Sequence, residues 1–231
     1  MDISKINDII NSQKDFLNKN SNTTSSRILL LKKLLLNIKI FEDEIYEALS
    51  KDLRKAKFES FLTEILLVEK EIKLFIKNLS KWSKDKKVKA SILNFPSKNY
   101  LKPEPYGKVL IITPWNYPFQ LSLTPLIGAF SSGNTVVIKP SELAPNTSSV
   151  LNRLIRETFP ENIVSVIQGD AEVSKSLLSK KWDYIFFTGS TRVGKIKDAL
   201  SLFKKALSID KNYDLALISK QKALELLKSK R

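Results

Sequence analysis

Three short polar segments hold the residues of this chain that are best suited to chemistry. They are Pro114-Trp115-Asn116, Lys139-Pro140-Ser141-Glu142 and Gly189-Ser190-Thr191-Arg192-Val193-Gly194. Each segment follows a short apolar run with the character of a β-strand. Because open α/β sheets bind ligands at the carboxyl ends of their strands, this placement is typical of a ligand-binding edge.

The glycine-rich segment has the context of a phosphate-binding turn, since it follows a strand-like run and opens a helical one. The common dinucleotide fingerprint has a middle glycine where this chain has Thr191, so the motif alone is a weak indication. With Lys195 the segment also matches most of a P-loop. Ile196, however, stands where the magnesium-binding Ser or Thr belongs, which argues against hydrolysis of a nucleoside triphosphate.

The other two segments each have two interpretations. Lys139 and Glu142 could both hydrogen-bond ribose hydroxyls, or they could simply end a strand and lead into a helix. Asn116, held between two prolines, could donate a hydrogen bond to an oxyanion, or it could be a buried structural amide. The flat indole of Trp115 could form one wall of a cofactor pocket.

Composition narrows the chemistry further. The 231 residues include no Cys and no His. Disulfides, thiolate nucleophiles, the commonest zinc ligands and the commonest general base are therefore excluded, and we expect no metal site. The net charge is +15, but the densest lysine run, residues 84–89, lacks interleaved aromatic residues that could stack on bases. We expect no nucleic-acid partner.

Two features bear on location. The apolar stretch at residues 28–40 is interrupted by three lysines, and it is shorter than the roughly 20 apolar residues of a membrane span. The first residues lack a basic region followed by an apolar run, so no signal peptide is indicated. The sequence thus predicts a cytoplasmic protein without a membrane partner.

The spacing of apolar residues predicts the elements that carry these segments. Helices are expected over residues 3–16, 27–50 and 59–82, and an extended arm or hairpin follows. Strands at residues 109–112, 135–138, 163–167 and 184–187 alternate with helices at residues 121–130, 147–158 and 171–179. The predicted fold class is α/β: amino-terminal helices, an incomplete doubly wound (Rossmann-like) parallel sheet and an α-helical hairpin tail.

Four segments follow from this pattern. They are an amino-terminal helical segment (residues 1–87), the arm or hairpin (88–106), an incomplete dinucleotide-binding domain (107–196) and the helical tail (197–231). The tail, from Asp198 to Tyr213, resembles the second helix of a tetratricopeptide repeat leading into another first helix, with Lys211 in place of the usual turn proline. Stacked repeats need about three neighbours to bury their faces, so a single broken repeat is not a peptide-binding groove.

Taken together, the motifs resemble the class 3 branch of the NAD(P)-dependent aldehyde dehydrogenase family over residues 4–196. The residues resemble those of the family at Asp52-Leu53-Arg54-Lys55, Asn94-Phe95-Pro96-Ser97-Lys98, Lys139-Pro140-Ser141-Glu142-Leu143 and Phe187-Thr188-Gly189-Ser190-Thr191. The resemblance implies NAD or NADP as cofactor. It assigns the adenosine ribose to Lys139 and Glu142, the pyrophosphate side to Gly189, Ser190, Thr191 and Gly194, the pocket wall to Trp115 and the oxyanion to Asn116.

The departures from the family pattern decide the expected activity. In the family an aldehyde adds to a cysteine, hydride passes to the nicotinamide, and a glutamate-activated water hydrolyses the thioester. This chain has neither that cysteine nor the Leu-Glu-Leu-Gly-Gly segment of the glutamate. We therefore expect a truncated aldehyde dehydrogenase-like protein, inactive alone. The alternative is an interaction or oligomerisation protein that docks through the tail or the arm, on a second copy or a related subunit.

Overall fold

The computed structural model describes residues 3–19, 22–89, 93 and 96–189. The chain divides into two units, Met1–Phe186 and Phe187–Arg231, so only residues 187–189 of the second unit are described. Ser190, Thr191, Gly194 and the tetratricopeptide-like tail therefore lie outside the described residues.

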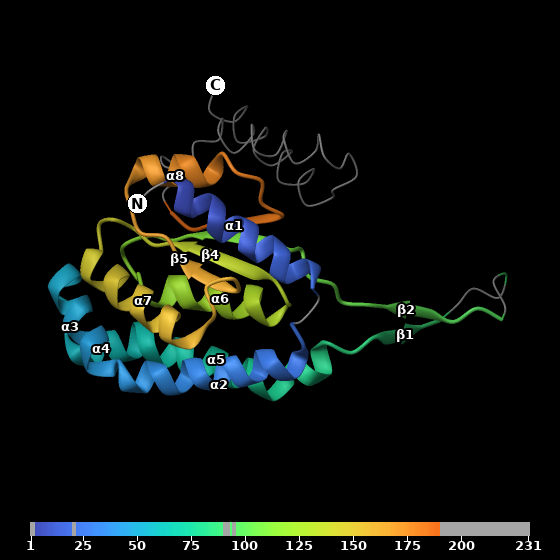
Figure 1. The fold of residues 1–231 in the computed structure, drawn as a ribbon. Coiled ribbons are helices and arrows are strands. Elements are labelled where there is room, and N and C mark those ends of the chain that lie inside the picture. The colour runs from blue at the N-terminus through green and yellow to red at the C-terminus, as the bar shows by residue number, and fades with distance from the viewer. Residues whose placement is uncertain (1–2, 20–21, 90–92, 94–95, 190–231) are drawn as a thin grey trace, which may run out of the picture. The chain divides into compact units, whose positions relative to one another are not determined.

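A four-stranded sheet forms the centre of the first unit (Figure 1). Its strands are β3 (Lys108–Ile112), β4 (Thr135–Lys139), β5 (Val164–Val166) and β6 (Tyr184–Phe187), in the order β5-β4-β3-β6. The pairs β3–β4 and β4–β5 run parallel, and the register places Ile111 opposite Ile138 and Ile138 opposite Val166. The carboxyl ends of β3, β4 and β5 therefore lie at one edge of the sheet.

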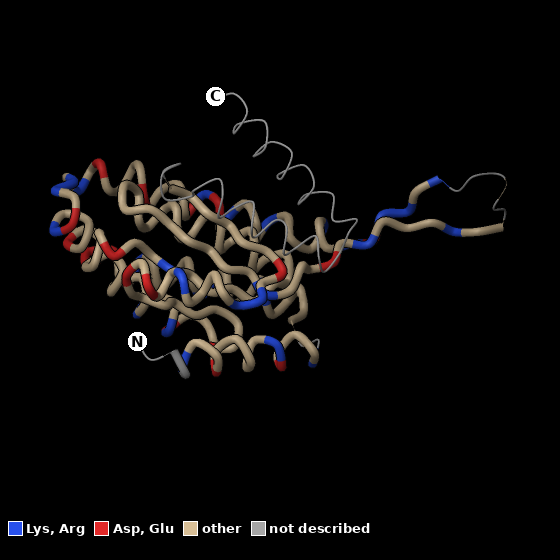
Figure 2. The backbone as a smooth tube through the Cα atoms, turned by 90° about the horizontal axis from the view of Figure 1, so that it is seen from above, with Lys and Arg blue, Asp and Glu red and all other residues tan. Residues whose placement is uncertain are grey.

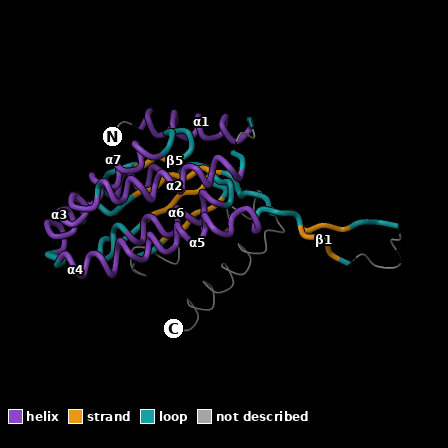
Figure 3. Tube along the Cα trace, turned by 90° about the horizontal axis from the view of Figure 1, so that it is seen from below, coloured by secondary structure: helices purple, strands orange, loops and turns teal. Residues whose placement is uncertain are grey.

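Helices surround this sheet in the manner expected of a doubly wound fold. Their bounds are α1 (Ile3–Asn18), α2 (Thr24–Ile40), α3 (Glu42–Leu53), α4 (Lys57–Ser60), α5 (Leu66–Trp82), α6 (Gln120–Ser131), α7 (Pro145–Thr158) and α8 (Ala171–Leu178). Helix α6 joins β3 to β4, α7 joins β4 to β5, and α8 precedes β6. Figure 3 shows α2, α5, α6 and α7 in front of the strands in the view from below. The predicted fold class is confirmed for the helices and the parallel sheet.

Alternation along the strands divides the apolar interior into two clusters. Val109 and Ile111 of β3 pack with the cluster that contains α2, α3, α5, α6 and α7. Leu110 and Ile112 point to the opposite face, where they meet α1 and α8. Because both faces are covered, every residue of β4 is buried, which explains why the strand runs read as continuously apolar.

The arm contains its own two-stranded sheet. Strands β1 (Lys86–Val88) and β2 (Asn99–Leu101) pair antiparallel, with Lys87 opposite Tyr100. Most side chains of this hairpin are exposed. Among the described residues, Figure 2 shows lysines and arginines here and on many other elements.

Two expected helices are interrupted. The segment predicted as one helix over residues 27–50 breaks at Phe41, whose buried ring ends α2. Glu42, Asp43 and Glu44 then occupy the first turn of α3, where acidic side chains are favourable. In the segment predicted over 59–82, residues Phe61–Ile65 form a π-helical turn between α4 and α5. Within the described part of the chain, no helix combines the length and apolarity that crossing a membrane requires.

Candidate functional site

Lys139 and Glu142, predicted to act together, are in direct contact at the end of β4. The Lys139 Nζ donates to Glu142 Oε2 at 2.6 Å. The lysine side chain is only 4% exposed, whereas the glutamate side chain is 45% exposed. Partial burial would raise the pKa of Glu142, but the hydrogen bond and charge of Lys139 lower it below its usual range. The pair therefore presents an ionised carboxylate to solvent at the carboxyl end of β4.

A third charged group, Asp170, follows the neighbouring strand. The Ile167 N–H donates to the Ile138 carbonyl at 2.8 Å, so the loop after β5 begins beside the end of β4. Gly169 has a φ of 154°, and a Cβ there would lie 2.4 Å from Val173 Cγ2, which favours glycine. Asp170 caps α8, and hydrogen bonds from the Val173 and Glu172 N–H groups lower its pKa, with a contribution from Lys139. The sequence analysis did not identify Asp170.

The loop after β3 presents Trp115 and Asn116 to solvent. Trp115 is 50% exposed, and Asn116 is exposed as well, so the alternative of a buried structural amide is wrong. The Thr113 N–H donates to the Lys139 carbonyl at 3.2 Å. This bond joins the start of the Trp115 loop to the strand end that carries the Lys139–Glu142 pair.

A buried ion pair beneath this loop was not anticipated. Lys55 Nζ lies 2.5 Å from Glu64 Oε1 and donates to the Asn116 carbonyl at 3.0 Å. The same ammonium lies 4.0 Å from the centre of the Tyr117 ring. The other carboxylate oxygen, Glu64 Oε2, accepts from the N–H groups of Phe119 at 3.1 Å and Gln120 at 2.9 Å, at the start of α6.

The ion pair between Lys55 and Glu64 is unusual because its carboxylate lies in the protein interior. The Glu64 side chain is fully buried in the π-helical turn. Burial raises the pKa of Glu64, although the bonds from Lys55 and from the two backbone N–H groups oppose that shift. A buried carboxylate needs such partners, because an unpaired charge in the interior is costly.

Asp52 performs a similar task at the start of α7. Its Oδ1 accepts from the Asn146 N–H and side-chain amide, and its Oδ2 accepts from the Thr147 N–H and hydroxyl. Asp52 thus caps a helix from 94 residues earlier in the chain. The segment Asp52-Leu53-Arg54-Lys55 had entered the sequence analysis only as part of the resemblance.

Gly189 belongs to the second unit. A Cβ at this position would lie 2.6 Å from the tip of the Phe187 ring, so the close approach of that ring favours glycine. The remaining predicted pyrophosphate-side residues, Ser190, Thr191 and Gly194, lie outside the described residues. Their assignments stay predictions.

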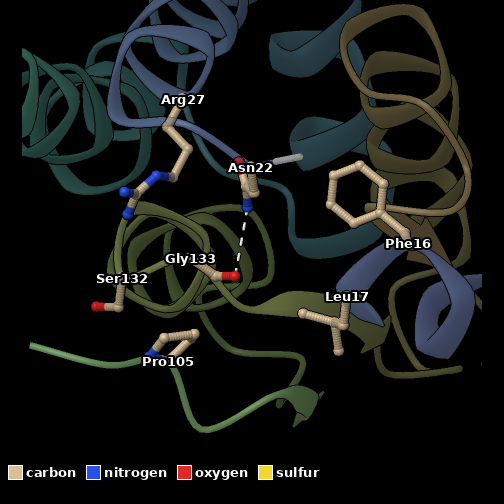
Figure 4. Close-up of a pocket in the computed structure, with 7 residues that line it drawn as sticks. All are labelled: Phe16, Leu17, Asn22, Arg27, Pro105, Ser132 and Gly133. Carbon is tan, nitrogen blue, oxygen red and sulfur yellow. Dashed lines mark hydrogen bonds between the residues drawn. The ribbon is translucent and has the colours of Figure 1, made fainter. Parts of the chain in front are cut away.

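A cavity of about 170 Å³ lies away from the candidate site (Figure 4). Its lining residues are Phe16, Leu17, Asn22, Arg27, Pro105, Ser132 and Gly133. Asn22 donates to the Gly133 carbonyl at 3.3 Å, and Arg27 donates to the Ser131 carbonyl. Gly133 precedes β4, so the cavity lies at the amino end of that strand, whereas Lys139 is at its carboxyl end.

Across the described ranges, acidic side chains form no group of three that could hold a metal ion.

The fold is that of a doubly wound α/β protein, with charged side chains at the carboxyl ends of its parallel strands. Residues 4–207 match the aldehyde dehydrogenase family, and the chain belongs to that family. It is 53% identical over 166 residues to the 4,4'-diaponeurosporen-aldehyde dehydrogenase of Staphylococcus aureus, covering 72% of this chain and 36% of that relative. It is 44% identical over 170 residues to the aldehyde dehydrogenase family 3 member H1 of Arabidopsis thaliana, covering 74% and 35%.

A solved structure gives the same result. The substrate-bound state of Staphylococcus aureus AldH matches with a TM-score of 0.82 and 48% identity, over 85% of this chain and 44% of that chain. The predicted family is therefore confirmed, with class 3 relatives covering the amino-terminal part of the chain. The chain spans about a third of the length of these curated relatives.

Proposed function

We propose that this chain binds the adenosine part of NAD or NADP at the carboxyl edge of its sheet. The observation that carries the proposal is the Lys139–Glu142 pair, in which a buried ammonium holds a half-exposed carboxylate at 2.6 Å. A carboxylate accepts hydrogen bonds from ribose hydroxyls, and an ammonium can donate to them. The residues present thus fit a ribose, and the position fits the general rule for open α/β sheets.

The other assignments extend the same proposal. Trp115 would form a wall of the cofactor pocket, and Asn116 would donate to a developing oxyanion, for which its exposed amide is suited. Gly189, Ser190, Thr191 and Gly194 would face the pyrophosphate. When bound, NAD or NADP would accept a hydride at its nicotinamide ring. The family reaction is the oxidation of an aldehyde to a carboxylic acid.

The isolated chain is expected to be inactive in that reaction. It contains no Cys to add to an aldehyde and no Leu-Glu-Leu-Gly-Gly segment to supply the glutamate. The cytoplasmic location expected from the sequence stays a prediction.

Calorimetric titration of the purified chain with NAD⁺ and NADP⁺ tests the proposal. The variant Glu142→Gln should weaken binding of the preferred nucleotide by roughly tenfold, because a charged acceptor of ribose hydroxyls is lost. Glu172→Gln is the matched control, since Glu172 is an exposed carboxylate that pairs with Lys175. Lack of binding by the unaltered chain would refute the proposal. Formation of NADH from an aldehyde by the chain alone would refute the expected inactivity.

The exposed hairpin supports a second candidate function, in which the chain pairs with a second copy or a related subunit. Tyr100 and Leu101 of β2 are 55% and 62% exposed. Light scattering of the unaltered chain and of Leu101→Asp would test this. A dimer that becomes a monomer supports pairing through the arm, whereas an unchanged mass counts against it.

For docking through the tail, deletion of residues 197–231 should abolish capture of the partner.

A further inference from the structure

The turn at residues 52–55 contacts the loop after β3 and the start of α7, the helix that follows the loop after β4. Asp52, near the end of α3, caps α7, which follows the Lys139–Glu142 loop. Lys55 binds the carbonyl of Asn116 in the loop after β3. Two side chains three residues apart thus contact the segments that follow two adjacent parallel strands.

The backbone conformation at Arg54 allows the side chains of Asp52 and Lys55 to point to different segments. Arg54 ends α3 with φ 54° and ψ 26°, a left-handed conformation that residues other than glycine rarely adopt. Because the helix ends there, Lys55 leaves the helical path and is buried, whereas Arg54 itself is exposed.

The contact through Asp52 continues to the ribose side. The carboxylate accepts four hydrogen bonds from Asn146 and Thr147, which fixes the first turn of α7. In that turn, Ser148 donates its hydroxyl to the Ser141 carbonyl at 3.1 Å. Ser141 directly precedes Glu142, so the helix start and the carboxylate-bearing loop are held together.

The contact through Lys55 continues to the Trp115 side. The ammonium touches Glu64, the Asn116 carbonyl and the face of Tyr117, while Glu64 fixes the N–H groups of Phe119 and Gln120. These contacts hold residues 116–120, which directly follow the exposed Trp115 in the chain. A buried ion pair is a poor device for stability alone, since desolvation offsets much of its attraction.

We propose that the turn Asp52–Lys55, with Glu64, is a positioning clamp that sets the geometry of both loops of the nucleotide site. Asp52 positions the ribose-side loop through α7, and Lys55 with Glu64 positions the loop that carries Trp115 and Asn116. The inference rests on the proposed function, because the clamp has a role only if a dinucleotide binds across both loops. These are positioning residues and do not themselves touch the ligand.

Comparison of NAD⁺ with ADP-ribose tests the clamp. ADP-ribose lacks the nicotinamide ring that the Trp115 loop would contact, so it reports on the ribose side alone. For Glu64→Gln and Lys55→Met, affinity for NAD⁺ should fall roughly tenfold while affinity for ADP-ribose stays within about twofold. Asp52→Asn should instead weaken both ligands by a similar factor. Lys57→Gln is the matched control, because Lys57 is an exposed lysine two residues away that pairs with Asp43.

The outcomes separate the clamp from the function on which it rests. If the unaltered chain binds neither ligand, the proposed function and the clamp both fail. If it binds both ligands but the Glu64 and Lys55 variants weaken them equally or not at all, only the clamp is refuted, since a purely structural pair would not discriminate between ligands. Should those variants not fold by circular dichroism, the same ratio is read on Lys55→Arg, which keeps the charge but not the compact ammonium.

Discussion

The two edges of the sheet differ in how their polar groups are used. At the amino end of β4, Arg27 and Asn22 line the cavity. Arg27 donates to the carbonyl of Ser131, the last residue of α6, and Asn22 donates to the Gly133 carbonyl in the loop that follows. At the carboxyl end, Glu142, Trp115 and Asn116 present exposed polar or aromatic groups. In the cavity, the polar side chains already donate to backbone carbonyls, so they support the structure. At the carboxyl end, the side chains are fixed by neighbouring contacts but remain exposed, so they are available to a ligand.

The largest expected effect would break this comparison at the carboxyl edge. Lys139→Met removes the buried ammonium that holds Glu142. Affinity for the preferred nucleotide should fall about thirtyfold, or ~2 kcal/mol. The ammonium would lose its charge-assisted hydrogen bonds both to Glu142 and to the ribose. Titration calorimetry measures the change. Unaltered affinity in a folded Lys139→Met protein would contradict the assignment of this edge as the site.

A smaller effect of a different kind is expected at the amino edge. Arg27→Ala removes the hydrogen bonds of the guanidinium to the Ser131 carbonyl and to Thr23 and Thr24. The free energy of unfolding should fall by about 1–2 kcal/mol, with nucleotide affinity unchanged. Urea denaturation and calorimetry together measure both quantities. A loss of affinity without a loss of stability would place a ligand in the cavity and reverse the comparison.

The smallest expected effect is a pH dependence at Asp170. The pKa of Asp170 is lowered from 3.8, so the folded state favours its charged form, and this stabilisation is present above pH 3.8 and lost as the pH falls through the lower folded value. Asp170→Asn keeps a good helix cap but loses the charge. The melting temperature of the variant should lie slightly below that of the unaltered chain at pH 7, and the difference should vanish in strong acid. An equal difference at both pH values would show that the charge is not responsible.

Much of the fold followed from local patterns. The strands at 135–138 and 184–187 are found within one residue of their expected bounds, because both runs are mostly apolar. Strand β4 is buried throughout, whereas β6 is partly exposed, so the apolar run and not complete burial marks both strands. The Lys139–Glu142 contact was also predictable, since the two groups are three positions apart at a strand end.

The supporting contacts were not predictable in the same way. Glu64 lies in a segment with helical spacing, and nothing in that spacing indicates a π-helical turn with a buried carboxylate. Asp52 and Lys55 contact residues 94 and 61 positions away, and such contacts depend on how helices pack on the sheet. The break at Phe41 likewise depends on where a buried ring fits, which the apolar period alone does not specify.

The buried carboxylate of Glu64 has a consequence for exchange of amide hydrogens with solvent. The first N–H groups of a helix have no partner within the helix, and they usually exchange early. Here Phe119 and Gln120 donate theirs to Glu64 Oε2. These two amides should be protected like those of a helix interior, and their exchange should report each opening of the loop before α6.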